Sequence, residues 1–396
     1  MIVTDGMGFF SEEKRDASHQ VSYLAPGVPA YHIVNTDNTG CFRIEKDILA
    51  DPWRDVVLQH TRFIPLQGRL EDYHLYALLA PHLNNQGDGN TAWVGEMKGI
   101  PMLFAEREDT ALVMASSGPW LKRSAGFVGV SDGWQDLHDH YQMTWTYDRA
   151  ENGNTALVGE IDLAACQGEF TLALGFGEIA MEAGHLARAS LLDGFQAAFR
   201  SYMNEWEAWQ KTLLELDTLP DPALDYRVST AVLRIHEAKN LSGGIIASLS
   251  IPWGDSKGDN DLGGYHLVWT RDLVESFTGL FAAGAGGDAA RVLRFLQVTQ
   301  EPDGHWPQNM WLDGTPYWQG VQLDETAFPI LLTSLAWQEG DLDSALLDSF
   351  WPMVRQAASY VICNGPVTQQ DRWEEDAGYS AFTLALGFGE IAMEAG

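Results

Sequence analysis

The sequence has little of three things: basic residues, cysteine and long apolar runs. Only 24 lysines and arginines stand against 55 acidic residues, which gives a formal net charge of −31. Such a chain repels phosphate backbones and anionic membranes, so we expect no nucleic-acid partner. The cysteines Cys41, Cys166 and Cys363 are few, odd in number and far apart. This argues against a disulfide framework or a thiolate metal site.

No run of about eighteen apolar residues occurs, and the opening MIVTDGMGFFSEEKRD lacks the basic start and apolar stretch of a secretion signal. We therefore expect a soluble protein that does not bind membranes, while its location and oligomeric state stay open. Tryptophan, in contrast, is abundant: fifteen occur, several beside Asp, Arg, Gln or Asn. Flat indole faces pack on sugar rings while polar neighbours bind hydroxyls, although tryptophan is also an ordinary core residue.

Up to about residue 190 the apolar residues recur with the period of strands. Segment 141–147 alternates apolar Tyr141, Met143, Trp145 and Tyr147 with polar residues, and an Asn-Gly turn signal follows at 152–153. Segment 72–83 alternates in the same way, with Tyr73, Leu75, Ala77 and Leu79 on one side. These patterns predict an antiparallel β-sandwich over residues 1–190.

From about residue 190 the period becomes that of helices. A long amphipathic stretch, 191–216, predicts a linker helix within 191–220. Further helices are predicted over Pro222–Leu241, Asp272–Ala283, Asp288–Gln300, Asp324–Gln338 and Ser344–Cys363. Short turns alternate with long loops between them, which predicts antiparallel helix hairpins with the long loops, and a binding site, at one end.

The first of three such loops, GDNDLGGYHLVWTRDLVES at 258–276, holds Tyr265, Trp269, Arg271 and Asp272 where a helix begins. The guanidinium of Arg271 donates several hydrogen bonds, and the carboxylate of Asp272 accepts them. As an alternative, an aspartate at a helix start is a common cap.

The second and third loops are rich in both aromatic and acidic residues. Loop 300–328 places Trp306, Trp311, Tyr317 and Trp318 among Gln308, Asn309, Gln322, Asp324 and Glu325. These indoles either line a sugar cleft or seal the mouth of the helical array. In loop 369–382, Glu374 and Glu375 follow Trp373. Adjacent carboxylates oppose each other's ionisation, so one of them can hold a proton as a general acid requires; the alternative is a solvated helix start.

With these motifs in order, the chain resembles the bacterial branch of glycoside hydrolase family 15, the glucoamylases and glucodextranases. WTRD, WPQNMWLDGTPYW with QLDE, and DRWEE carry the resemblance, which spans almost the whole chain. It implies a β-supersandwich, a linker helix and an (α/α)6 barrel. It also implies exo-acting release of glucose from the non-reducing ends of α-glucans, with inversion.

The resemblance implies roles for single residues. Glu374 matches the general acid, and Glu375 matches a neighbour that contacts substrate. Tyr265, Trp269, Arg271 and Asp272 match the pocket for the terminal glucose, and Trp318, Gln322 and Asp324 match the wall and polar support near the acid. No cofactor or metal is assigned, and only the acidic loop at 256–264 points to calcium. The linkage (α-1,4, α-1,6 or trehalose) stays open, and the alternative from another class is a non-catalytic glucan-binding remnant.

The final fifteen residues, 382–396, repeat residues 170–184 letter for letter. In the first copy the apolar residues alternate as in a strand, whereas the succession of helix hairpins predicts a helix at the position of the second copy. There Gly387 and Gly389 would each cost about 1 kcal/mol relative to alanine. We interpret 381–396 as an aberrant tail from a mistaken join, 221–380 as the first half of a barrel, and the front as clipped. Because the general base of the family follows later, we expect little or no hydrolysis by the chain as written.

Overall fold

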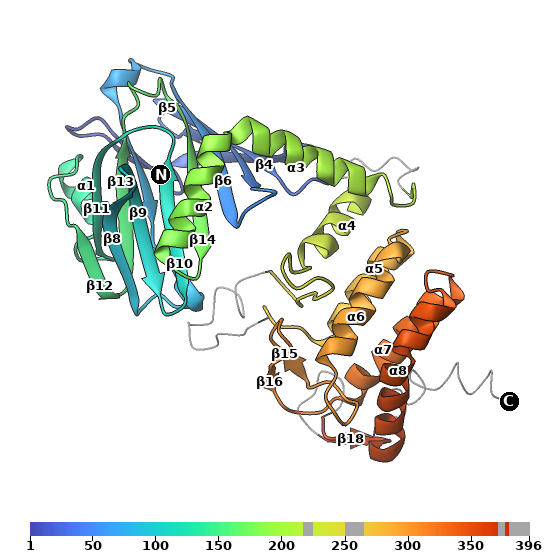
Figure 1. Cartoon of the computed structure of the whole chain (residues 1–396). Helices are drawn as coiled ribbons and strands as arrows, with labels where there is room; N and C mark the ends of the chain where they lie inside the picture. The colour runs from blue at the N-terminus through green and yellow to red at the C-terminus, as the bar shows by residue number, and fades with distance from the viewer. Residues whose placement is uncertain (217–224, 250–264, 371–376, 380–396) are drawn as a thin grey trace. The chain divides into compact units, whose positions relative to one another are not determined.

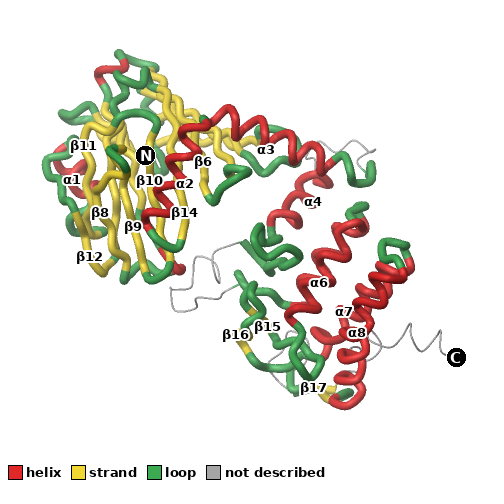
Figure 2. Tube along the Cα trace, viewed as in Figure 1, coloured by secondary structure: helices red, strands yellow, loops and turns green. Residues whose placement is uncertain are grey.

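The computed structural model describes residues 1–216, 225–249, 265–370 and 377–379 (Figures 1 and 2). The chain forms two compact units, Met1–Ala208 and Trp209–Gly396. The predicted order of a β region followed by a helical region is confirmed, because strands β1 to β14 belong to the first unit and helices α4 to α8 to the second.

Two antiparallel sheets make up the first unit. The nine-stranded sheet has the order β12-β8-β9-β10-β14-β6-β5-β4-β3, and the five-stranded sheet has the order β11-β13-β7-β1-β2. The nine strands are β3 (Ala17–Tyr23), β4 (Tyr31–Asp37), β5 (Phe42–Ala50), β6 (Val56–Pro65), β8 (Asn90–Met97), β9 (Ile100–Arg107), β10 (Thr110–Ser116), β12 (Arg149–Gly153) and β14 (Glu169–Gly177). The five are β1 (Ile2–Thr4), β2 (Phe10–Glu12), β7 (His74–Leu79), β11 (Trp120–Phe127) and β13 (Thr155–Ile161).

The sheets pack face to face and are flanked by helices. Phe42 and Phe63 of the larger sheet meet Leu75 and Leu157 of the smaller one in a single buried core. Helix α2 (Ala180–Asp193) covers the outer face of the larger sheet, and α1 (Gly133–His140) covers that of the smaller. The alternation predicted for 72–83 is confirmed in β7, since Leu75 and Ala77 face the sandwich core while Tyr76 faces α1.

The strand predicted at 141–147 is wrong. These residues follow α1 as an irregular segment, although Met143 is buried as the pattern requires. The reason is the buried carboxylate of Asp136, which accepts the backbone N–H groups of Thr144 and Trp145 at 2.7 and 3.1 Å. Backbone donors bonded to a side chain are not available to a strand ladder.

The helix predicted over 191–216 is interrupted. Helix α2 ends at Asp193, α3 spans Phe195–Gln210, and Gly194 between them has a φ of 83°, which favours glycine. Because α2 already begins at Ala180, the first copy of the repeated fifteen residues covers most of β14 and the start of α2. The second copy, 382–396, lies outside the described residues.

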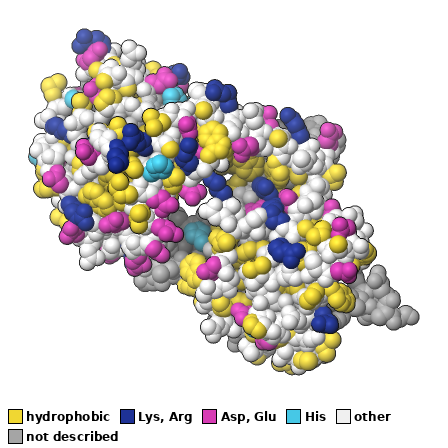
Figure 3. Space-filling model, viewed as in Figure 1, with side chains coloured by type: hydrophobic (Ala, Val, Ile, Leu, Met, Phe, Trp, Pro, Cys, Tyr) yellow, Lys and Arg dark blue, Asp and Glu magenta, His cyan; other side chains and the backbone are white. Residues whose placement is uncertain are grey.

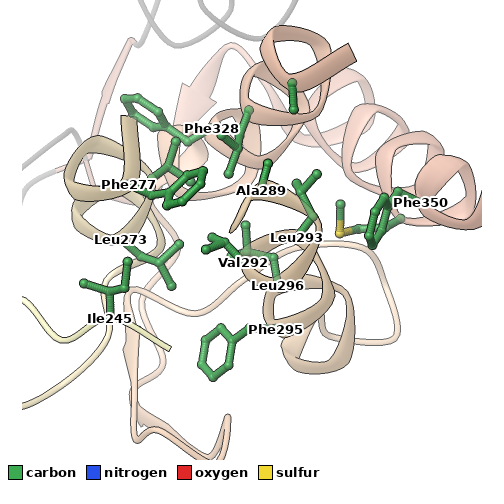
Figure 4. Close-up of a cluster of buried hydrophobic side chains, with 14 of the residues drawn as sticks. Ile245, Leu273, Phe277, Ala289, Val292, Leu293, Phe295, Leu296, Phe328 and Phe350 are labelled. Atoms are coloured by element: carbon green, nitrogen blue, oxygen red, sulfur yellow. The ribbon is translucent and has the colours of Figure 1, made fainter. Parts of the chain in front are cut away.

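The predicted helices of the second unit are confirmed, four of them to within two residues at each end, whereas the one predicted over Pro222–Leu241 ends six residues early, at Ile235. They are α4 (Asp225–Ile235), α5 (Thr270–Ala282), α6 (Ala289–Thr299), α7 (Leu323–Gln338) and α8 (Ser344–Asn364). Short turns join α5 to α6 and α7 to α8, and the starts of α5 and α7 lie together. Figure 4 shows the core that unites them, in which Phe277, Leu293, Phe328 and Phe350 are buried. This is the hairpin arrangement of an (α/α)6 barrel.

Acidic and basic side chains are interspersed on the face of the molecule that Figure 3 shows. The face in Figure 3 shows acidic groups spread over both units rather than gathered in one patch. Among the described helices, none is long and apolar enough to cross a bilayer.

Candidate functional site

The candidate site is built where α5 and α7 begin. Segment 265–268, which leads into α5, is paired on both sides: Ala247 N–H donates to Leu267 at 2.9 Å, and Val268 and Met310 exchange two backbone hydrogen bonds of 2.9 and 3.0 Å. Strand β15 (Asn309–Met310) in turn pairs with β16 (Pro316–Trp318). The backbone that leads to both helices is therefore held by one small network of strands.

The polar part of the site, the Arg271 cluster, comprises Arg271, Asp272, Gln322, Asp324 and Glu325. Nη1 of Arg271 donates to Asp324 Oδ2 at 2.7 Å and to Gln322 Oε1 at 2.9 Å. It also lies 3.0 Å from Glu325 Oε1. The backbone N–H of Arg271 donates to Glu325 Oε2 at 2.6 Å. Two helix starts far apart in the sequence are thus joined through a single arginine.

The Arg271 cluster holds more negative than positive charge. The side chains of Arg271, Asp324 and Glu325 are at most 2% exposed, whereas that of Asp272 is 36% exposed and lies 3.6 Å from Arg271 Nε. Burial raises the pKa of Glu325 well above its usual range, and burial also raises the pKa of Asp272, with Arg271 opposing both shifts. Burial by itself lowers the pKa of Arg271, but Glu325 and Asp324 more than offset this, so its pKa is raised and the guanidinium stays charged.

Five rings form an aromatic row beside this cluster. The successive ring centroids of Tyr265, Trp269, Trp318, Tyr317 and Trp311 are 5.8, 6.2, 5.8 and 5.4 Å apart. The two ends of the row, Tyr265 and Trp311, are exposed, whereas Trp269 is buried. Apolar ring faces next to buried and half-exposed polar groups are the combination that sugar rings require.

The structure brings together most of the predicted site residues. Tyr265, Trp269 and Trp318 lie in the aromatic row, and Arg271, Asp272, Gln322 and Asp324 lie in the Arg271 cluster. The predicted acid Glu374 and its neighbour Glu375 lie outside the described residues, as does the acidic loop at 256–264. Trp306 belongs to neither group, because it is fully buried in the helical core and its indole N–H donates to Leu296 at 3.1 Å.

The chain on either side of 371–376 is fastened to the start of α7. Strand β17 (Val367–Thr368) pairs with β18 (Gly378–Tyr379). The hydroxyl of Thr368 accepts the N–H of Leu323 at 3.3 Å, and the N–H of Gln370 donates to Val321 at 3.2 Å. Residues 367–370, which precede this segment in the sequence, therefore lie next to residues 321–323, which lead into the Arg271 cluster.

Sequence reasoning missed the role of Glu325. In the motif QLDE, the resemblance implies roles for Gln322 and Asp324 but none for Glu325. A signal was present in the helix that follows, TAFPILLTSLAW, which has no polar face. A helix that is apolar on all sides is surrounded by protein, so the acidic residues of its first turn must be buried as well.

Comparison with known proteins gives matches over both units. Residues 1–211 match the family model described as glucodextranase, domain N, and residues 303–387 match the model of glycosyl hydrolases family 15. The chain is 38% identical to a glucoamylase of Clostridium sp. (strain G0005) over 384 residues, which is 97% of the chain and 53% of the relative. It is 26% identical to an uncharacterized glycosyl hydrolase of Methanocaldococcus jannaschii over 126 residues, 31% of the chain and 20% of the relative.

Among solved structures, the chain superposes on a bacterial glucoamylase crystallised with acarbose. The TM-score is 0.88 at 37% identity, and the match covers 100% of the chain and 58% of the glucoamylase. The chain thus spans slightly more than half the length of both glucoamylases that it matches.

Proposed function

Because the chain belongs to glycoside hydrolase family 15, with the N domain of glucodextranases, we propose that it binds the non-reducing end of an α-glucan at the aromatic row and the Arg271 cluster. The observation that carries this proposal is that the aromatic row and the Arg271 cluster are adjacent. Trp269, one of the rings in the row, is the residue just before α5, and Arg271 and Asp272 lie in the first turn of that helix. The aromatic faces would hold the apolar face of a sugar. The half-exposed carboxylate of Asp272 would accept hydrogen bonds from its hydroxyls.

Within this site, each polar residue has a distinct task. Arg271 is 2% exposed and already donates to Asp324 and Gln322, so it acts mainly as a brace. Asp272, adjacent to it and half-exposed, is the member of the cluster that can reach a ligand. Asp324 and Gln322 keep the guanidinium in place. Sugar affinity should therefore depend directly on Asp272 and indirectly on the buried partners.

We assign the general acid to Glu374, which follows Gln370 by four residues. Support comes from the attachment of β17 and Gln370, which precede this residue in the sequence, to the start of α7, which carries part of the Arg271 cluster. Protonation of the glycosidic oxygen by a carboxylic acid, with water attacking from the opposite face, inverts the configuration at the anomeric carbon. That geometry needs a second carboxylate about 6.5–9.5 Å from the first.

No residue of the described ranges is assigned as that second carboxylate, since Asp272 is given to substrate and Asp324 and Glu325 are buried. We therefore propose that the 396-residue chain binds glucans but releases little or no glucose by itself. The reaction that we propose for the family site is the exo-acting release of glucose from α-glucans with inversion, and the groups described here would bind the substrate of that reaction. The glucan-binding remnant is the alternative function that the unassigned base favours.

Calorimetric titration of the purified chain with acarbose, maltotriose, isomaltotriose and trehalose tests the proposal. Acarbose is the oligosaccharide bound in the matching glucoamylase structure, and the other three distinguish the linkages. We expect binding that weakens at least about tenfold in Trp318→Ala and Asp272→Asn. A matched control is Trp351→Ala, which removes an exposed indole of α8 and should leave affinity unchanged.

Glucose release from maltotriose and isomaltotriose tests the proposed lack of turnover. Binding without turnover, unaffected by Glu374→Gln, supports the glucan-binding remnant. Rapid glucose release by the 396-residue chain would refute the proposed lack of activity, and its loss in Glu374→Gln would then identify the acid. Absence of any sugar binding by the wild-type chain would refute the proposed function.

A further inference from the structure

The first turn of α5 has no capping residue of its own. Its N-cap position is occupied by Trp269, whose indole N–H is a donor and cannot accept a hydrogen bond from the helix backbone. The first N–H groups of a helix have no partner within the helix, and leaving them unpaired in a buried place is costly. The N–H of Arg271, in this first turn, is bonded by Glu325 from the start of α7.

Glu325 holds Arg271 at two points. Its Oε2 accepts the backbone N–H at 2.6 Å, while its Oε1 lies 3.0 Å from Nη1 at the far end of the same residue. Within the described part of the chain Oε1 accepts no hydrogen bond, so this second contact is one of charge. One carboxylate thus fixes both the main chain and the side-chain direction of Arg271.

Charge neutralisation alone does not explain this arrangement. Asp324 already pairs with the guanidinium at 2.7 Å, and Gln322 supplies a neutral acceptor at 2.9 Å. A second fully buried carboxylate beside the same cation adds a desolvation cost that one positive charge does not repay. The raised pKa of Glu325 is a sign of that cost. A neutral side chain that still accepts the N–H of Arg271, such as glutamine, would serve stability without that cost.

We propose that Glu325 is the positioning residue of this site: by holding the N–H and the guanidinium of Arg271 together, it fixes the first turn of α5 and thereby the place from which Asp272 meets a bound sugar. The part of this inference that concerns sugar rests on the proposed function. The contact of Glu325 with Arg271 requires no ligand. The two parts can therefore be tested separately.

The ligand-free test is hydrogen exchange of the backbone, measured by mass spectrometry on peptides that cover 267–274. In Glu325→Ala we expect faster exchange at the start of α5, with peptides of α6 and α8 unchanged. Glu339→Gln, which changes an exposed acid at the opposite end of α7, serves as the matched control and should leave all peptides unchanged. Equal exchange of peptide 267–274 in wild type and Glu325→Ala would overturn the positioning role.

The ligand test separates affinity from the amount of folded protein. Acarbose titration gives both a Kd and a binding stoichiometry, and a merely structural role lowers only the stoichiometry. For Glu325→Gln, which keeps the shape and an acceptor for the N–H but removes the charge, we expect the Kd to rise about tenfold or more at full stoichiometry. Glu325→Asp, one methylene shorter, should weaken binding similarly although it restores the charge, because it cannot span both contacts.

The outcomes can be told apart. Wild-type Kd in both Glu325→Gln and Glu325→Asp would overturn the inference while leaving the proposed function intact. If the wild-type chain bound no sugar, the proposed function and the ligand part of the inference would both fail. The exchange experiment would still decide whether Glu325 holds the start of α5. Should Glu325→Ala not fold, the exchange measurement on Glu325→Gln and Glu325→Asp replaces it, with the larger effect expected for the shorter side chain.

Discussion

Two glutamates, one in each unit, are buried to a similar extent but have opposite surroundings. In the β unit, Glu13 is 7% exposed and contacts the ammonium groups of Lys46 and Met1 at 2.6 and 2.8 Å. In the helical unit, Glu325 is fully buried and shares one arginine with two aspartates. Burial tends to raise both pKa values, but the two ammonium groups bring that of Glu13 down to about 2, whereas the pKa of Glu325 stays well above its usual range.

This difference separates a structural carboxylate from one at a functional site. An acid surrounded by cations is stable where it is, and its ionisation supports the fold. An acid outnumbered by other acids is retained at a cost, and such groups concentrate where a protein binds or reacts with something else. The following experiments test that contrast, beginning with the largest expected effect.

Removal of the shared cation should be the most damaging change. Arg271→Met leaves Asp324 and Glu325 buried without a counter-charge, and we expect a loss of about 3–5 kcal/mol in the stability of the helical unit. Urea unfolding followed by hydrogen exchange of α5 and α7 peptides measures it. Arg355→Met, at an exposed position on α8, is the control. Equal stability of the two variants would contradict the idea that the cluster depends on this one cation.

Removal of one cation from Glu13 should be less severe, because a second ammonium remains. We expect Lys46→Met to destabilise the β unit by about 2 kcal/mol at neutral pH. Since the pKa of Glu13 is lowered from 4.5 to about 2, its stabilisation is complete above pH 4.5 and is lost as the pH falls through 2. The stability difference between wild type and Lys46→Met should therefore narrow on acidification. A difference independent of pH, or an equal loss in the exposed variant Lys98→Met, would contradict this explanation.

A smaller effect is expected at the start of α7, the helix that carries two buried acids of the Arg271 cluster. Thr368→Val keeps the shape but removes the hydroxyl that accepts the N–H of Leu323 and donates to Gln370 at 2.7 Å. We expect a loss of about 1–2 kcal/mol, together with weaker acarbose binding, because α7 carries Asp324 and Glu325. Thr315→Val in the exposed β15–β16 turn is the control. Unchanged acarbose affinity in Thr368→Val would show that the start of α7 does not position the site.

A helix with its own cap should respond in stability alone. Asp343 caps α8 by accepting the N–H of Leu346 at 2.8 Å, and it takes no part in the Arg271 cluster. We expect Asp343→Ala to cost about 1 kcal/mol in thermal unfolding while the Kd for acarbose stays at the wild-type value. A weaker Kd in this variant would mean that any helix start in this unit affects sugar binding, and the special position of α5 and α7 would be lost.

The fold could be predicted largely from local patterns. Helices α5 to α8 begin and end close to the predicted residues, because each contributes apolar side chains to a common core. Segment 141–147 has an equally clear period but is not a strand, because Asp136 binds its backbone N–H groups. Periodicity reports which side chains are buried. It does not report where the backbone finds its hydrogen bonds.

The residues of the site could be predicted from the sequence, but the hydrogen bonds that join them could not. Arg271, Gln322 and Asp324 were selected from motifs, and the structure shows them in direct contact. The bond from the N–H of Arg271 to Glu325 joins residues 54 positions apart, and nothing local to either residue specifies it. The sequence offers Asp272 as a cap of α5, but Trp269 occupies the N-cap position and the acceptor for the N–H of Arg271 comes from another helix.

The aromatic row has a spectroscopic consequence. Its five rings, three of them indoles, succeed one another at centroid separations of 5.4 to 6.2 Å. Chromophores this close couple their electronic transitions, so the near-ultraviolet circular dichroism of the chain should contain a signal from the row. A molecule that settles against any of these rings would alter that signal, and occupancy could be followed in solution without a label.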